Sequence, residues 1–174
     1  VAGTIGAVGD NGVGVAGVNW HVQVLAIKAF NSGGTATDAA LITAIQIAVE
    51  VKRAGVNLRV INNSWGGGFM QAFEDALREA NDEGILIVAS AGNSNSNNDT
   101  SPQYPSNYAL PNVIAVAATD NRDQRANFSN YGVQTVHIAA PGVDVLSTTR
   151  NNTYNFFSGT SMAAPHVSGA AALV

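Results

Sequence analysis

The chain has 174 residues, of which 46% are hydrophobic and 11% are charged, and its formal net charge is −4. This composition excludes disorder and predicts one compact domain, because disordered chains combine high charge with few apolar residues. With no basic stripe and no apolar run near the roughly 20 residues of a membrane span, we expect neither nucleic acid nor a membrane as a partner. The absence of cysteine excludes disulfides, a thiolate nucleophile and zinc–thiolate sites.

In chain order, we predict a strand at 22–30, a helix at 35–54, a strand at 58–62, a helix at 69–80, strands at 85–90, 113–119 and 136–142, and a helix at 161–174. Strands without alternation, separated by amphipathic helices, indicate an α/β fold with a parallel open sheet covered by helices on both faces. Ligands of such sheets bind at the carboxyl ends of strands. Here those ends are followed by the loops after Ile61, after Ser90 and after 136–142.

Three glycines near the start of the chain match the dinucleotide-binding pattern G-x-G-x-x-G. They are Gly12, Gly14 and Gly17, and Asp38 follows 21 residues later, near the spacing of a ribose ligand. That pattern requires a helix opening from the glycines, but the residues after Gly17 have an extended pattern. Asp38 belongs to a helix start that we expect Thr35 to cap. A tight glycine loop is therefore expected in place of a nucleotide site.

A segment at the start of the last helix carries the clearest chemistry. Residues 159–166 read Gly-Thr-Ser-Met-Ala-Ala-Pro-His. A serine in the first helical turn lies at the positive end of the helix dipole, beside free N–H groups that stabilise a developing oxyanion. This position suits acyl transfer at Ser161, and simple helix capping is the alternative. The G-x-S-x-G elbow of α/β-hydrolases is absent.

This segment resembles the nucleophile segment of subtilisin-like serine proteases, and the resemblance extends along the whole chain. The other matching segments are 1–6, 61–67, 90–93 and 140–142. The resemblance implies that residues 1–174 are a partial peptidase catalytic domain, truncated at both ends. It also implies that Ser161 is the nucleophile, and that Asn93 donates its amide to the oxyanion together with the Ser161 N–H. Thr160 is implied to support the same hole.

The resemblance also implies a substrate pocket. Its two walls would be formed by Ser64, Trp65 and Gly66, and by Ser90, Ala91 and Gly92. Residues 66–68 are all glycine, so we expect their backbone to be free to approach an extended peptide. No carboxylate follows them as in the kexin-like branch, which favours a broad or apolar substrate preference.

The loop from Val8 to Val15 resembles the calcium loop of the same family. Calcium prefers oxygen ligands, and the implied set is the Asn11 side chain with the carbonyls of Val8, Val13 and Val15. One extra residue in this loop leaves Asp10 as an alternative side-chain ligand. A simple glycine turn without a metal is the other alternative.

A serine nucleophile needs a base and an orienting carboxylate. In the subtilase pattern both residues lie upstream of Val1, and we expect His21, His137 and His166 to be packed or surface residues. The chain alone is therefore expected to be inactive. It is also expected to be marginally stable at best, because the family's catalytic Asp lies on a central strand and its absence leaves backbone groups unpaired.

Two functional hypotheses remain. In the first, the chain is part of an exported serine endopeptidase that cleaves polypeptides, is monomeric when full length, and has a pro-region or an inhibitor as a further partner. In the second, it is a non-catalytic protein that uses the subtilisin fold for binding or assembly. The intact Gly-Thr-Ser-Met-Ala-Ala-Pro and Ala-Gly-Asn elements favour the first.

Overall fold

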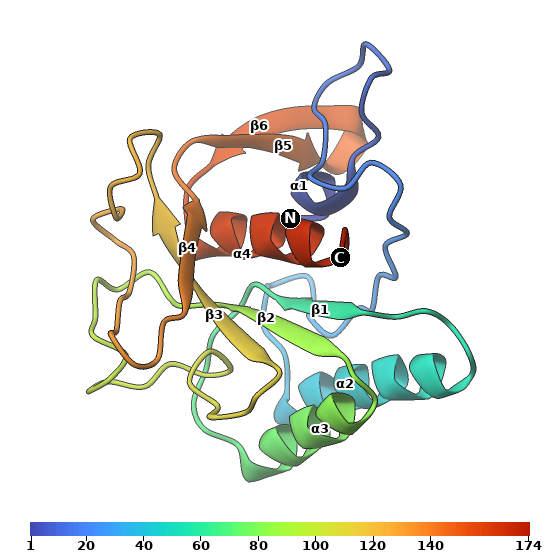
Figure 1. Cartoon of the computed structure of the whole chain (residues 1–174), viewed down its shortest axis with the longest axis vertical. Helices are drawn as coiled ribbons and strands as arrows, with labels where there is room; N and C mark the ends of the chain where they lie inside the picture. Colours follow the sequence, from blue (N-terminus) through green and yellow to red (C-terminus); the bar gives the residue numbers. More distant parts are fainter.

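A computed structural model describes all residues, 1–174, and contains a main sheet of 4 parallel strands in the order β1–β2–β3–β4 (Figure 1). The strands are β1 (Val60–Asn63), β2 (Leu86–Ser90), β3 (Val113–Thr119) and β4 (Ile138–Pro141). Parallel neighbours cannot be joined by a tight hairpin, so each connection returns over a face or an end of the sheet.

Helices cover both faces of this sheet (Figure 1). On one face lie α2 (Asp38–Arg53) and α3 (Gln71–Asp82), and on the other lie α4 (Thr160–Ala171) and the short α1 (Ala2–Gly6). The predicted α/β fold with a sheet covered on both faces is therefore confirmed. None of the helices is both long and apolar enough to cross a membrane.

Two hydrophobic clusters fill the two sides of the sheet. The larger one joins α2 and α3 to the strands, and its fully buried members include Phe73, Leu77 and Ile87. The smaller one lies between the strands and α4 and contains small side chains such as Ala118 and Ala163. Small residues let α4 pack closely on the sheet, which determines where the first turn of α4 lies relative to the strand ends.

Most predicted elements are present, with ends shifted by a few residues. The strand at 113–119 matches β3 in full, but α2 begins at Asp38, three residues later than predicted. The cap is Thr37, whose Oγ1 accepts a hydrogen bond from Ala40 N–H at 3.2 Å. Thr35 instead accepts a bond from Asn31 Nδ2 at 2.8 Å. Which of two neighbouring threonines caps a helix thus depends on a contact with the preceding loop.

The predicted strand at 22–30 is wrong. This segment forms no backbone–backbone hydrogen bonds, and β1 at the edge of the sheet pairs only with β2. A strand exists only through a ladder with a neighbour, and no neighbour pairs with this segment despite its β-branched residues. The low stability expected of residues 1–174 alone stays a prediction.

An antiparallel hairpin lies between β4 and α4, and the sequence did not reveal it. It consists of β5 (Val145–Thr149) and β6 (Thr153–Phe157), joined by a 3₁₀ turn at Arg150–Asn152. Asn151 adopts a φ of 62°, a left-handed conformation that asparagine tolerates better than most residues. The hairpin returns the chain to the residues that begin α4.

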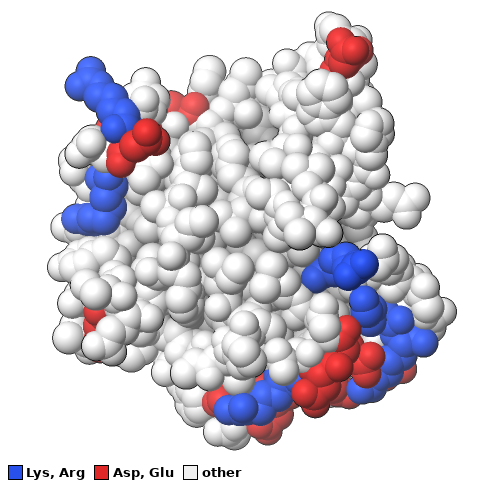
Figure 2. All heavy atoms as spheres, viewed as in Figure 1, with Lys and Arg blue, Asp and Glu red and all other residues white.

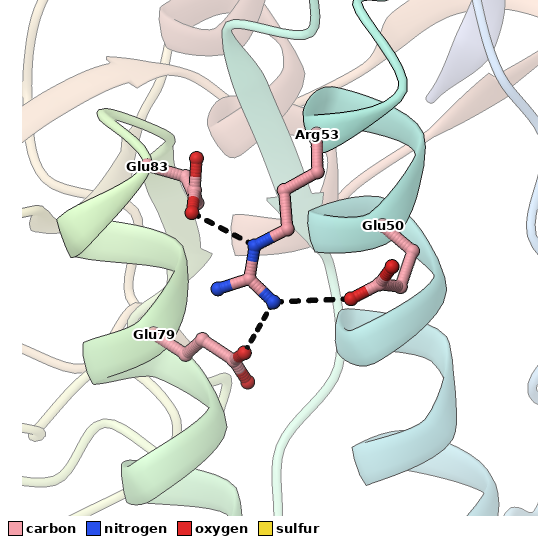
Figure 3. Close-up of polar contacts among 4 residues, drawn as sticks. All are labelled: Glu50, Arg53, Glu79 and Glu83. Atoms are coloured by element: carbon pink, nitrogen blue, oxygen red, sulfur yellow. Dashed lines mark hydrogen bonds and ion pairs between the residues drawn. The ribbon is translucent and has the colours of Figure 1, made fainter.

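Charged side chains gather mainly over α2 and α3, and the centre of the same face carries few (Figure 2). Arg53 of α2 bonds Glu50 on its own helix at 3.0 Å, and Glu79 and Glu83 of α3 at 2.8 Å each (Figure 3). Hydrogen bonds to Glu83, Glu50 and Glu79 raise the pKa of Arg53 further, so the guanidinium remains charged. Because the group is exposed, its main effect is to align α3 with α2, and its effect on stability is small.

Candidate active site

Three connections meet at the first turn of α4. Each connection forms one hydrogen bond with residues 159–161. Gly159 N–H donates to Gly142 O at 2.8 Å, Thr160 N–H to Asn93 Oδ1 at 2.8 Å, and Ser64 Oγ to Ser161 O at 3.1 Å. The partners follow β4, β2 and β1 respectively. The carboxyl ends of these strands therefore surround the start of α4, which is where open parallel sheets bind ligands.

Ser161 is half-buried in this first turn. Its hydroxyl donates to the backbone carbonyl of Ser64 at 3.2 Å, and Ser64 Oγ accepts from Asn62 Nδ2 at 2.8 Å. The Ser161 N–H makes no hydrogen bond within the chain, because the first N–H groups of a helix have no carbonyl before them to bond. One residue thus presents both a hydroxyl and an unpaired donor at the positive end of the helix dipole.

The side chain of Asn93 has a defined orientation. Its Oδ1 accepts bonds from Thr160 N–H at 2.8 Å and from Thr160 Oγ1 at 2.9 Å, while its Nδ2 donates to no group in the chain. Thr160 is only 1% exposed, and its Oγ1 also accepts from Gly92 N–H at 3.2 Å. The Thr160 hydroxyl proton therefore bonds Asn93. This bond fixes the orientation of the Asn93 amide.

The two nitrogen atoms that carry the unpaired donors lie near each other, beside Gly159. A Cβ added to Gly159 would lie 3.6 Å from Asn93 Nδ2 and 3.7 Å from the Ser161 N atom. Two unpaired N–H donors near one another, one of them on the residue that carries a serine hydroxyl, are the kind of groups that can stabilise an oxyanion. The structure therefore brings Asn93 and Ser161 together from positions 68 residues apart in the sequence.

The two segments expected to form pocket walls also lie together. Ser90 Oγ donates to the carbonyl of Trp65 at 3.5 Å. Gln103 lies against both segments, because a Cβ on Gly66 would be 2.4 Å from Gln103 Nε2 and one on Gly92 would be 3.4 Å from Gln103 Cγ. Sequence reasoning missed Gln103, since nothing in its surroundings says where the long loop after β2 returns to the sheet.

The expectation of a free backbone over residues 66–68 is wrong at Gly67. Its N–H donates to Tyr104 O at 2.8 Å, and its carbonyl accepts from Tyr104 N–H at 3.2 Å. The backbone groups of Gly66 and Gly68 form no hydrogen bonds within the chain. Beside them lies an open hollow of about 410 Å³, lined mostly by apolar residues and glycine, in which Asp38 is the only charged residue.

The three histidines do not hydrogen-bond Ser161. His166 Nδ1 bonds the backbone carbonyl four residues earlier in α4 at 2.9 Å, and burial lowers its pKa. His137 Nδ1 accepts from Ala115 N–H at 2.9 Å, and His21 is exposed. These are the packed and surface positions expected from the sequence.

The loop from Val8 to Val15 projects from the body of the protein (Figure 1) and borders a hollow of about 240 Å³. The backbone carbonyls of Val8, Val13 and Val15 accept no hydrogen bond within the chain, and Asn11 Oδ1 accepts one from Val13 N–H at 3.0 Å. Oxygen atoms without protein partners around one hollow fit the ligand chemistry of calcium.

The long loop after β2 is anchored through Asp99. The carboxylate accepts from Thr135 Oγ1 at 2.8 Å and from the N–H groups of Val133, Gln134 and Thr135 at 2.8, 3.2 and 3.0 Å. The Thr135 hydroxyl, more than any other donor, holds the pKa of Asp99 below its usual value. This anchor joins the loop that carries Asn93 to the β3–β4 connection.

We expect Asp99→Asn to lower the thermal midpoint of the full-length protein at neutral pH, and the difference from wild type to shrink below about pH 4. The folded-state pKa of Asp99 lies below its unfolded value of 3.8, so the carboxylate stabilises the fold above that pH and loses this effect as pH falls through the folded pKa. Thermal unfolding across this pH range measures it. Asp123→Asn, at an exposed carboxylate without a partner, is the control, and a pH-independent difference would contradict the assignment.

The chain matches the subtilase family over residues 1–174. It is 44% identical over 176 residues to subtilisin DY of Bacillus licheniformis, with 100% of this chain and 61% of that protein covered. It is 42% identical over 175 residues to a thermostable alkaline protease of Halalkalibacterium halodurans, with 100% of this chain and 45% of that protein covered. The chain thus spans less than two thirds of the length of these relatives.

Solved structures have the same fold. A cold-adapted subtilisin-like serine proteinase superposes with a TM-score of 0.83 at 32% identity, over 99% of this chain and 58% of that one. A protease of Pseudoalteromonas arctica superposes with a TM-score of 0.87 at 33% identity, over 99% and 56%. Motifs, fold and family match agree over the whole length, and this chain belongs to the subtilase family.

Proposed function

We propose that this chain carries the nucleophile and the oxyanion-binding groups of a serine endopeptidase that hydrolyses peptide bonds through an acyl-enzyme on Ser161. The observation that carries the proposal is the pair of unpaired donors, Asn93 Nδ2 and Ser161 N–H, beside the serine hydroxyl. Relatives named subtilisin and alkaline protease support it. Residues 1–174 would then be part of one catalytic domain.

In the proposed reaction, Ser161 Oγ bonds to the carbonyl carbon of the substrate and transfers its proton to a base. The carbonyl oxygen becomes an oxyanion between Asn93 Nδ2 and Ser161 N–H, which lie where negative charge develops. Collapse of this intermediate expels the amine, which takes the proton, and water then releases the acyl group by the same steps. We propose that the base and its carboxylate belong to the segment that the subtilase pattern places before Val1, and that residues 1–174 alone are inactive.

Polypeptide substrates would bind across the residues that follow β1 and β2. The unpaired backbone of Gly66 can pair with an extended peptide. The two walls, residues 64–66 and 90–92, contain no carboxylate, which supports a broad or apolar preference. A pro-region or an inhibitor would occupy the same groove. We further propose an exported, monomeric full-length protein.

The test of the proposed function is reaction of the full-length protein with a fluorophosphonate probe. We expect one equivalent of label on Ser161, located by peptide mapping, because only an activated serine attacks this phosphorus centre. Residues 1–174 alone should remain unlabelled. A folded full-length protein that takes up no label would exclude the peptidase and favour a binding or assembly role.

We also propose that the Val8–Val15 loop binds a structural calcium ion through the carbonyls of Val8, Val13 and Val15 and the side chain of Asn11. Bound calcium would link both ends of the loop and so stabilise the folded state.

We expect millimolar Ca²⁺ to raise the thermal midpoint of the full-length Ser161→Ala protein by roughly 5 °C, since a ligand at 100 times its Kd stabilises by about 2.7 kcal/mol. Excess chelator should reverse the rise, and Asn11→Ala should reduce it. Magnesium at the same concentration is the control, because it needs a tighter octahedral site than this loop offers. If Asp10→Ala abolished the rise and Asn11→Ala did not, Asp10 would be the side-chain ligand.

A further inference from the structure

Asn130 lies in the connection between β3 and β4, 31 residues before the proposed nucleophile, and is 1% exposed. Its backbone N–H donates to Gly92 O at 2.9 Å. Its side-chain Oδ1 accepts from Ser94 N–H at 2.8 Å and from Ser96 N–H at 3.1 Å. A single buried residue therefore bonds the backbone immediately before and immediately after Asn93.

The orientation of the Asn130 amide is determined by its other partners. Its Nδ2 donates to Asn98 Oδ1 at 2.9 Å, and Asn98, which is fully buried, donates through its own Nδ2 to Ala91 O at 2.9 Å. The Asn98 carbonyl in turn accepts from Asn107 Nδ2 at 2.8 Å. If the Asn130 amide were flipped, its NH₂ group would face the Ser94 N–H and its oxygen would face Asn98 Oδ1. Only one orientation therefore satisfies the network.

The absence of a side chain at Gly92 allows the Asn130 amide to lie close to the loop backbone. Gly92 has a φ of 110°, and an added Cβ would lie 2.5 Å from Asn130 Nδ2, so a side chain at this position would collide with the network. Asn130 thus holds the backbone of the loop both before and after Asn93. The Asn93 side chain is held separately by Thr160. Together these bonds fix the backbone around Asn93 and the orientation of its amide.

We propose that Asn130 is a positioning residue for the oxyanion donor Asn93. The inference rests on the proposed peptidase function. Loss of the Asn130 side chain leaves the N–H groups of Ser94 and Ser96 without their acceptor, so the backbone after Asn93 is freed and Nδ2 leaves the place where the oxyanion forms. Misplacement of a reacting group by about 1 Å can lower the rate by about 10². The bonds from Asn130 N–H to Gly92 O and from Asn98 Nδ2 to Ala91 O do not use the Asn130 side chain, so the substrate wall and the serine hydroxyl stay in place and the loss falls on kcat.

A double-mutant cycle in the full-length protein tests this proposal. We expect Asn130→Ala to lower kcat about tenfold and to change KM less than about twofold, with rates normalised to the active sites titrated by a fluorophosphonate. In an Asn93→Ala background the same change should alter kcat less than about twofold, because no donor remains to be positioned. Asn127→Ala, at an exposed asparagine three residues away that forms no side-chain hydrogen bond, is the matched control.

An equal loss of kcat in both backgrounds, or a loss carried by KM, would overturn the proposal and leave Asn130 with a structural role only. If Asn93→Ala itself left kcat unchanged, the oxyanion assignment would be the failed step, and Asn130 would have nothing to position. If Asn130→Ala does not fold, Asn130→Ser is read in the same cycle, since a serine hydroxyl can bond within the vacated volume but cannot reach both loop amides.

Discussion

Replacing Ser161 by alanine in the full-length protein is expected to lower kcat by about 10⁶, a magnitude established for subtilisin, to which this chain is related. The other hydroxyl at the start of α4, that of Thr160, is buried and bonded to Asn93, so only the Ser161 hydroxyl can form the acyl bond and its loss removes the covalent path. The donors Asn93 Nδ2 and Ser161 N–H remain in the variant, because one is a side chain elsewhere and the other is backbone. A small residual rate above that in water should therefore persist.

Single-turnover hydrolysis of a chromogenic peptide measures this loss. Ser32→Ala is the matched control, since Ser32 is exposed and its side chain forms no hydrogen bond. Circular dichroism should show an unchanged fold in both variants. Retention of more than about 1% of wild-type kcat in Ser161→Ala would contradict the assignment of the nucleophile, because no other hydroxyl could replace it so well.

Replacing Asn93 by alanine is expected to lower kcat by about 10² to 10³ with little change in KM, again a magnitude established for subtilisin. The amide donates to an oxygen that carries full negative charge only after attack, so its loss raises the barrier without weakening substrate binding. Steady-state kinetics at saturating and at low peptide concentrations separate the two parameters.

The isosteric variant Asn93→Asp distinguishes hydrogen-bond donation from shape. Aspartate keeps the acceptor for Thr160 N–H and Oγ1 but replaces the Nδ2 donor by a carboxylate oxygen. We expect a loss of kcat at least as large as in Asn93→Ala, because a negative charge would face the oxyanion. Asn121→Ala, at an exposed asparagine without a side-chain hydrogen bond, controls for a general effect of substitution. An Asn93→Asp protein with wild-type kcat would contradict the donor role.

Ser161 and Asn93 were identified from short motifs, and only the structure shows how they cooperate. The motif around Ser161 predicts a helix start, and the helix leaves the Ser161 N–H unpaired whatever surrounds it. The orientation of the Asn93 amide depends on Thr160, and Thr160 becomes its neighbour only when α4 packs on the sheet. Such contacts join distant segments, and a local pattern does not encode them.

The strand predicted at 22–30 is a case in which a local pattern gave the wrong structure. Its β-branched residues carry a strong local preference, yet without a neighbouring strand the segment has no ladder. The β5–β6 hairpin was missed because its side chains are largely exposed and lack a clear alternation. Gln103 and Asn130 were missed because their roles depend on which backbone they approach.

By itself, the sequence determined the layers of the fold and the identity of the candidate nucleophile. The period of the apolar residues indicates whether a segment is a helix or a strand and which of its sides is buried. The first N–H groups of a helix are unpaired in any protein. Only the tertiary structure decided which strands pair, which side chain orients Asn93, and which buried asparagine supports its loop. Strand ladders and side-chain hydrogen bonds require partners within about 3 Å, and chain folding alone brings residues as far apart as Asn93 and Thr160 to that distance.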